Sequence, residues 1–155
     1  MAATPATQAL DLAGVNYKLH AYDYDPNADS IGLAAARSLG VEPARMLKTL
    51  IVRADGKFAC VILRSDREAS MKRVAAALGA KAAEMAKPVD AERATGFKVG
   101  GVSPFGQKKP APTVLDASAL NHATVFVNGG RRGLQAELDP REILRALRAK
   151  PADIA

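Results

Sequence analysis

The segment MLKTLIVR-ADG-KFACVIL, residues 46–63, decides the fold. Residues 46–53 and 57–63 are rich in β-branched and other apolar side chains, and Asp55 and Gly56 lie in the short segment between them. An Asp-Gly pair between two such runs is typical of a tight hairpin turn, because both residues tolerate positive φ. Both runs are apolar on their two faces, so we expect this hairpin at the centre of a sheet that is covered on each side.

The chain on either side of the hairpin predicts further strands and helices. Capping side chains, prolines in first turns and glycines after last turns mark the helix ends. Helices are expected over residues 5–13, 31–39 and 70–78, from 88 onward and from 140 onward, and strands over residues 15–24, 82–85, 113–115 and 124–127. Because these elements do not alternate as regular βαβ units, the sequence predicts an α+β fold, with helices packed around a mixed, curved sheet.

The length and the cysteine content indicate the number of domains and the kind of compartment in which the protein works. At 155 residues the chain has the size of a single domain, residues 1–155. Its one cysteine, Cys60, cannot form an internal disulfide, which is typical of a reducing compartment. The sequence shows neither a signal peptide nor an apolar stretch long enough to span a bilayer. We therefore expect a cytoplasmic protein without a membrane partner.

The net charge of +6 gives a slight preference for polyanionic partners. With three Tyr, four Phe and no Trp, the chain is poorly supplied with platforms on which many bases could stack. These two observations favour a protein that grips phosphates and one terminal group over one that reads a run of bases.

Lys48 is the most unusual side chain of the hairpin. Alternation along the strand places it on the same face as Met46, Leu50 and Val52, towards an apolar layer. A buried ammonium group is costly unless it is paired. One interpretation is that the side chain extends from the end of the strand into solvent. The other is that it lines a pocket, where it meets a phosphate or a developing oxyanion, or acts as a base of lowered pKa.

Residues 99–110, VGGVSPFGQKKP, form a glycine- and proline-rich loop that could present backbone groups to a small polar ligand. Ser103 superficially resembles the serine of a hydrolase nucleophile elbow, but Pro104 follows it and has no N–H to donate to an oxyanion. His20 and His122 lie in no recognisable triad pattern. One cysteine and two distant histidines also make a poor metal ligand set, so no metal site is expected.

Arginines gather towards the end of the sequence. Arg131 and Arg132 lie between glycines, where they could grip a phosphate or a carboxylate. Arg141, Arg145 and Arg148 form one stripe on the last helix, for which a solvated face is preferred over an RNA contact.

In their order and spacing, six segments resemble the YbaK family of aminoacyl-tRNA deacylases, which is related to the editing domain of bacterial prolyl-tRNA synthetases. The resemblance covers nearly the whole chain. Its carriers are YDYDP (22–26), LKTL (47–50), KRVAAALG (72–79), GGVSPFGQKK (100–109), NGGRRGL (128–134) and ADIA (152–155). The resemblance implies a six-stranded, partly open barrel, no metal and no organic cofactor.

The resemblance also implies an activity and a site. The activity is removal of cysteine mischarged onto tRNA(Pro), and also from tRNA(Cys), with the substrate's own thiol attacking its ester. Lys48 matches the essential lysine, and residues 100–104 match a loop whose backbone holds the aminoacyl group. The implied catalytic residues are Lys48 and Tyr22, and the implied substrate-binding residues are Gly100, Gly101, Ser103, Pro104, Asn128, Gly129, Gly130 and Gln135.

Gln135 departs from the acidic residue that the best-known cysteine-specific members carry. Gln135 can form hydrogen bonds but carries no charge. A deacylase for another small residue such as alanine, and a non-catalytic tRNA-binding module, therefore stay open as alternatives. The resemblance further implies aminoacylated tRNA(Pro) as a partner, with prolyl-tRNA synthetase in a transient complex.

Overall fold

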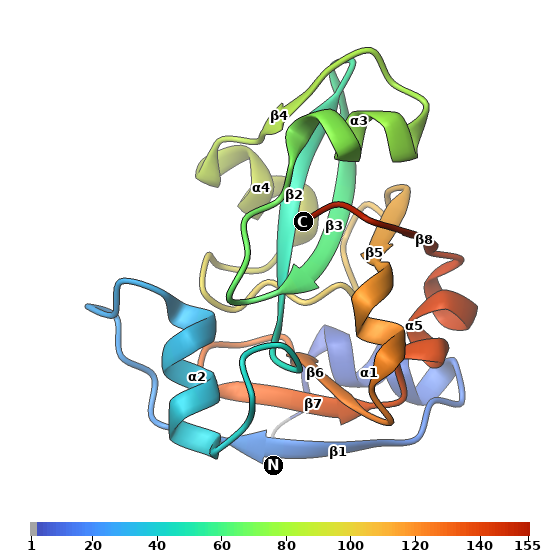
Figure 1. Ribbon diagram of the computed structural model, residues 1–155. Helices are drawn as coiled ribbons and strands as arrows, with labels where there is room; N and C mark the ends of the chain where they lie inside the picture. Colours follow the sequence, from blue (N-terminus) through green and yellow to red (C-terminus); the bar gives the residue numbers. More distant parts are fainter. Residues whose placement is uncertain (1–2) are drawn as a thin grey trace.

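The computed structural model describes residues 3–155 (Figure 1). Its helices are α1 (Pro5–Leu12), α2 (Ile31–Leu39), α3 (Met71–Leu78), α4 (Pro88–Thr95) and α5 (Pro140–Leu147), with a 3-10 helix η1 (Ala117–Asn121). Its strands are β1 (Tyr17–Ala21), β2 (Leu47–Ala54), β3 (Lys57–Arg64), β4 (Ala83–Met85), β5 (Thr113–Asp116), β6 (Val125–Asn128), β7 (Leu134–Leu138) and β8 (Lys150–Ala152). None of the helices within residues 3–155 is both long and apolar enough to cross a membrane.

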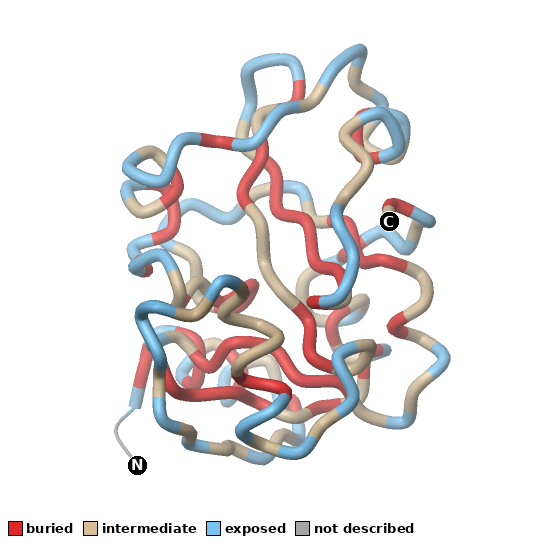
Figure 2. The backbone as a smooth tube through the Cα atoms, turned by 60° about the vertical axis from the view of Figure 1, so that its left-hand side comes forward, coloured by how far each residue is buried: buried red, intermediate tan, exposed pale blue. Residues whose placement is uncertain are grey.

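The predicted hairpin is confirmed as the antiparallel pair β2–β3. Asp55 and Gly56 have φ values of 50° and 81°, the left-handed conformations that a primed hairpin turn requires. The pair lies inside a sheet of order β4-β2-β3-β5-β8. Most of β3 is buried, whereas residues 48–50 of β2 are partly exposed, and Figure 2 colours these two classes red and tan. Ile51 packs into one hydrophobic cluster and Val52 into another, which confirms that both faces of the hairpin are covered.

The expected six-stranded, partly open barrel is wrong. The strands form two open sheets, one of three strands in the order β1-β7-β6 and one of five. Within residues 3–155 the two sheets are joined by a single parallel bridge between Met46 and Phe126, next to which the Phe126 N–H donates to the Arg45 carbonyl at 2.8 Å. The α+β class and the mixed sheet are confirmed, because β3–β5 and β5–β8 are parallel and the other pairs are antiparallel.

The helices begin and end where their capping residues predict. Thr4, Ser30, Ser70 and Asp139 each accept a backbone N–H of the first turn. Glycines in the left-handed conformation end α2, α3 and α4. Arg141 and Arg145 on α5 are exposed and pair with Asp139 and Glu142, as expected of a solvated face, whereas Arg148 follows the helix as a left-handed C-cap and does not extend the stripe.

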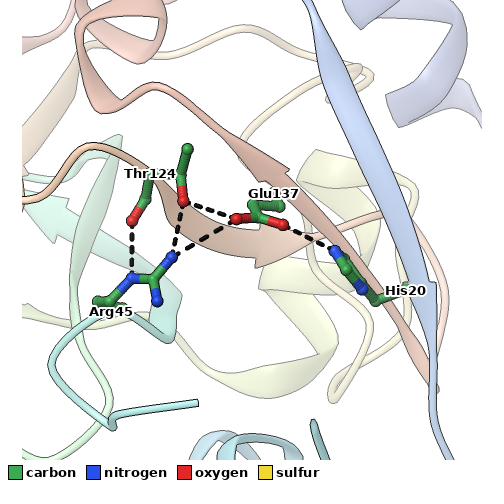
Figure 3. Close-up of polar contacts among 4 residues, drawn as sticks. All are labelled: His20, Arg45, Thr124 and Glu137. Carbon is green, nitrogen blue, oxygen red and sulfur yellow. Dashed lines mark hydrogen bonds and ion pairs between the residues drawn. The ribbon is translucent and has the colours of Figure 1, made fainter. Parts of the chain in front are cut away.

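A polar cluster fastens the start of β2 to the small sheet (Figure 3). Glu137 accepts from Thr124 Oγ1 at 2.6 Å, contacts His20 Nε2 at 2.9 Å and lies 3.5 Å from Arg45 Nη2. Arg45 also donates to Thr124 Oγ1 at 2.7 Å. The Thr124 hydroxyl above all, followed by His20 and Arg45, holds the pKa of Glu137 below its ordinary value of 4.5. His20 therefore has a structural role, as the lack of a triad pattern indicates.

We expect Glu137→Gln to lower the free energy of unfolding by about 1 kcal/mol at neutral pH, because the charged acceptor of this cluster is lost. A carboxyl whose pKa is lowered by folding stabilises the protein above its unfolded pKa, and this stabilisation disappears as the pH falls through the folded pKa. The difference between wild type and variant should therefore shrink below pH 4.5. Denaturant unfolding at several pH values measures it, and a constant difference would contradict the assignment.

Candidate active site

A cavity of about 320 Å³ opens between the two sheets. It is bordered by the first turn of α2, one edge of β2, the end of β4, the start of α4, the loop at 99–102 and the ends of β6 and β7. The residues that line it are Ser30, Ile31, Gly32, Leu47, Lys48, Thr49, Leu50, Ile51, Met85, Ala86, Pro88, Ala91, Val99, Gly100, Val102, Asn128 and Gln135.

The cavity exists because β4 is shorter than the strand beside it. β4 pairs with Val52–Ala54, and one further bond runs from the Ala86 N–H to the Ile51 carbonyl at 3.0 Å. Residues 47–50 of β2 extend beyond that bond and line the cavity. In an antiparallel ladder, alternate residues direct their backbone groups to the same side. The N–H and carbonyl of Thr49 therefore point to the cavity side, as those of Ile51 do.

Lys48 lies in the wall of this cavity and is partly buried. Burial lowers the pKa of its amine, and the negative charges of Glu68 and Asp66 oppose this effect. Lys48 thus lies where the pocket interpretation requires it, and its role there stays a prediction. Gly100 and Val102 line the same cavity, so the lysine and the glycine-rich loop share one site.

Asn128 ties the glycine-rich loop to the arginine-bearing turn between β6 and β7. Its amide donates to the carbonyls of Gly100 at 3.4 Å and Arg131 at 3.2 Å, and its oxygen accepts from the Gly130 N–H at 2.7 Å. Arg132 donates to the Val99 carbonyl at 2.9 Å. The two loops therefore form one wall of the cavity, with Gly100 at a φ of 90° that favours glycine.

Four of the expected site residues meet at the cavity, namely Lys48, Gly100, Asn128 and Gln135. The lining does not include Gly101, Ser103, Pro104, Gly129 or Gly130. Ser103 is fully buried and accepts from the Phe105 N–H at 3.1 Å, so its hydroxyl does not face the cavity. Tyr22 also lies outside the lining, packed against Ala35, Ala36, Met46 and Phe126.

Two side chains bring unpaired polar atoms to the lining. Gln135 is only 5% exposed, and its Oε1 has no hydrogen-bond partner among residues 3–155. The Oγ1 of Thr49 is likewise buried and unpaired within that range. A buried polar group without a partner is costly, so both atoms are available to a bound ligand. Sequence reasoning missed Thr49 as a site residue, although it adjoins Lys48 within the LKTL segment.

The chemistry of the lining is limited to one amine, amides and hydroxyls. Among the described residues, the lining contains no Asp, Glu, His or Cys. Cys60 is buried in β3, its thiol lies 3.5 Å from Gln107 Nε2, and burial raises its pKa to about 12. Such a thiol is inert as a nucleophile. No three His, Cys, Asp or Glu side chains within residues 3–155 gather as a metal site would require.

The cavity can therefore position a reactive ligand and stabilise negative charge. It offers Lys48 as a cation and the open edge of β2 as a source of backbone hydrogen bonds. A side chain that could act as an activated nucleophile is missing from the described lining, so a ligand that reacts here must supply its own nucleophile or use water.

Comparison with known proteins identifies the kind of domain. The aminoacyl-tRNA editing domain family matches residues 25–146. An Enterococcus faecalis protein named "Putative Cys-tRNA(Pro)/Cys-tRNA(Cys) deacylase EbsC" is 34% identical over 153 residues, which are 97% of this chain and 92% of that protein.

Two further relatives are similar over different lengths. A proline–tRNA ligase of Caldicellulosiruptor saccharolyticus is 40% identical over 83 residues, 54% of this chain and 14% of the ligase. A solved structure described as "a putative trans-editing enzyme for prolyl tRNA synthetase" superposes with a TM-score of 0.84 over 97% of this chain and 94% of that one. At 23% identity, this last likeness shows the fold alone.

Proposed function

Because the chain belongs to the aminoacyl-tRNA editing domain family, it is an aminoacyl-tRNA deacylase, and we propose that it removes cysteine from mischarged tRNA(Pro) in trans. This confirms the resemblance to the YbaK family. The observation that carries the choice of substrate is a cavity with a cation and hydrogen-bonding groups but, among the described lining residues, no activated nucleophile. Cysteine esterified to tRNA brings a thiol into such a site. The full-length similarity to the E. faecalis protein supports the same substrate, with tRNA(Cys) as a second acceptor.

In the proposed reaction the substrate's sulfur attacks the carbonyl carbon of its own ester. A C–S bond forms, the C–O bond to the terminal ribose breaks, and the thiol proton passes to the ribose oxygen. The products are a cyclic thioester of cysteine and a tRNA with a free terminal hydroxyl. The protein contributes position and charge stabilisation, which lower the barrier most where negative charge develops on oxygen. This step needs neither a metal nor an organic cofactor.

We assign Lys48 to the ester and the adjoining phosphate, where its ammonium group would offset developing negative charge. Gln135 and Asn128 are direct cross-strand neighbours at the ends of β6 and β7. The Gln135 amide would meet the substrate from the opposite wall, and the Asn128 amide, bonded to the loop backbone, would hold that wall in place. The unpaired oxygen of Gln135 suits a donor such as the substrate's α-ammonium group. Tyr22 would act as a positioning residue, because it packs beneath α2, whose first turn lines the cavity.

The decisive experiment charges tRNA(Pro) separately with Cys, Ala and Ser and follows the loss of each ester. We expect Cys to be released at least about tenfold faster than the other two, because only Cys carries a strong internal nucleophile. Fast release of Ala with slow release of Cys would show the alternative specificity for alanine. Binding of tRNA with a steep salt dependence and no ester loss above background would show a non-catalytic module.

We further propose that residues 1–155 act as one domain in the cytoplasm, where tRNA is charged, and that prolyl-tRNA synthetase joins it in a transient complex. The motivation is the 40% identity to an 83-residue part of a proline–tRNA ligase. Adding the synthetase to the deacylation assay should raise the selectivity for tRNA(Pro) over other cysteinyl-tRNAs. An unchanged selectivity would remove the synthetase from the proposal.

A further inference from the structure

Exposed apolar side chains gather at the mouth of the cavity. Of the large hydrophobic side chains that are exposed within residues 3–155, Met85 (51%), Val89 (57%) and Val99 (45%) lie here, and Leu12 lies elsewhere, on α1. Met85 and Val99 line the cavity itself, and Val89 follows Pro88, which also lines it. Exposed apolar surface of this kind is typical of a binding site.

Lysines alternate with these apolar side chains. Lys87 lies between Ala86 and Pro88, which both line the cavity, and Lys98 directly precedes Val99. Both lysines are exposed, and neither forms an ion pair within residues 3–155. We call the set of Met85, Lys87, Val89, Lys98 and Val99 the rim.

Two of the carboxylates nearest in sequence to the rim already have partners. Asp90 lies 3.6 Å from Arg53 Nη2, and Glu92 accepts from the Val99 N–H at 2.8 Å. Glu84 is exposed on β4, opposite Arg53 in the β2–β4 pairing. The rim therefore combines apolar surface with two free positive charges, and it adjoins the cavity that holds Lys48.

We propose that the rim binds the single-stranded nucleotides that precede the esterified nucleoside of the tRNA. This inference rests on the proposed function. Each nucleotide presents a flat, largely apolar base and one negative phosphate, which match an apolar side chain and a lysine in alternation. Once the esterified end enters the cavity, the preceding strand has to leave across its mouth. Aliphatic side chains stack more weakly than aromatic ones, so the rim holds these nucleotides without reading many bases.

The test compares Lys87→Ala/Lys98→Ala with the matched control Lys18→Ala/Lys57→Ala, which removes the same charge from exposed positions outside the cavity lining. On cysteinyl-tRNA(Pro), the rim variant should raise KM about tenfold with little change in kcat. The slope of log KM against log salt concentration should fall by about 1.4, since each phosphate contact with a single strand contributes about 0.7. The control variant should shift both quantities far less.

A truncated substrate separates the rim from the cavity. With cysteine esterified to adenosine alone, which lacks the preceding phosphates, the rim variant and wild type should react equally. Val89→Ser, at a position outside the cavity lining, tests the apolar half and should raise KM for the charged tRNA but not for the charged adenosine. An equal loss on both substrates, or a rim variant that behaves like the control on tRNA, would overturn the inference.

Two further outcomes are informative. If the rim variant loses activity only when a synthetase is present, the rim is a protein contact and the inference is wrong. Binding of uncharged tRNA, measured by fluorescence anisotropy, tests the contribution of the rim to affinity independently of ester cleavage. A wild type that binds tRNA through the rim but cleaves no ester would sink the proposed function and leave the rim assignment standing.

Discussion

Lys48→Ala should lower the rate of Cys-tRNA(Pro) deacylation by about 10³-fold, because it removes the one cation of the cavity lining from the site of developing negative charge. The variant should fold normally, since Lys48 is only partly buried and its burial opposes the charged form. Single-turnover rates on cysteinyl-tRNA(Pro), with thermal unfolding as the check on folding, measure the effect.

Lys72→Ala, an exposed lysine on α3, is the matched control and should keep full activity. A folded Lys48→Ala variant with near wild-type turnover would remove Lys48 from the site. The pH profile of the wild type separates its two possible roles. An anchor acts in the protonated form, so activity would fall as the pH rises through the lowered pKa, whereas a base acts when deprotonated and activity would rise there.

Gly101→Ala should lower kcat/KM by about 10²-fold without unfolding the protein. A methyl group on Gly101 would lie 2.8 Å from the Arg132 nitrogen and 2.9 Å from the Arg131 carbonyl carbon. Both are backbone atoms, so the two loops of the cavity wall have to move apart. A displacement of about 1 Å in a site that works by positioning costs this much in rate.

Gly96→Ala controls for the general cost of replacing a glycine. Gly96 ends α4 at a φ of 81°, and its added methyl group would have no neighbour closer than 3.6 Å. This variant should lose some stability from its positive φ but keep its kcat/KM. If both variants lose activity in proportion to their stability, the packing of the two loops does not position the site.

The sequence predicted the elements that depend on local rules. The β2–β3 hairpin, its Asp55-Gly56 turn and the capped helices each follow from a few neighbouring residues. The strand β7 was missed although Gln135 and Glu137 alternate with apolar residues as in a half-buried strand, because the stretch is only five residues long and its pairing with β1 and β6 is not local. β8 was missed for a similar reason, as it has three residues and contains Pro151.

The sequence could predict those parts of the site that depend on short-range sequence patterns. Lys48 was found because a charge on an apolar strand face is unusual. Asn128 and Gln135 were named from the family resemblance alone. They reach the cavity from the small sheet, and no pattern among their sequence neighbours indicates this. The open edge at Thr49 was missed because it depends on where β4 ends, and the first turn of α2 was missed because it reaches the cavity from a distant part of the sequence.

Because Cys60 is buried, the protein itself should contribute little signal to an assay that detects free thiols. A chromogenic disulfide reagent consumes thiolates, and the chain's one sulfhydryl is buried and has a pKa of about 12. Colour from quenched samples would therefore report the thiols of the substrate and its products. The esterified cysteine has a free thiol and a cyclic thioester has none, so colour that drops as the ester is lost and recovers as water opens the ring would reveal the intermediate directly.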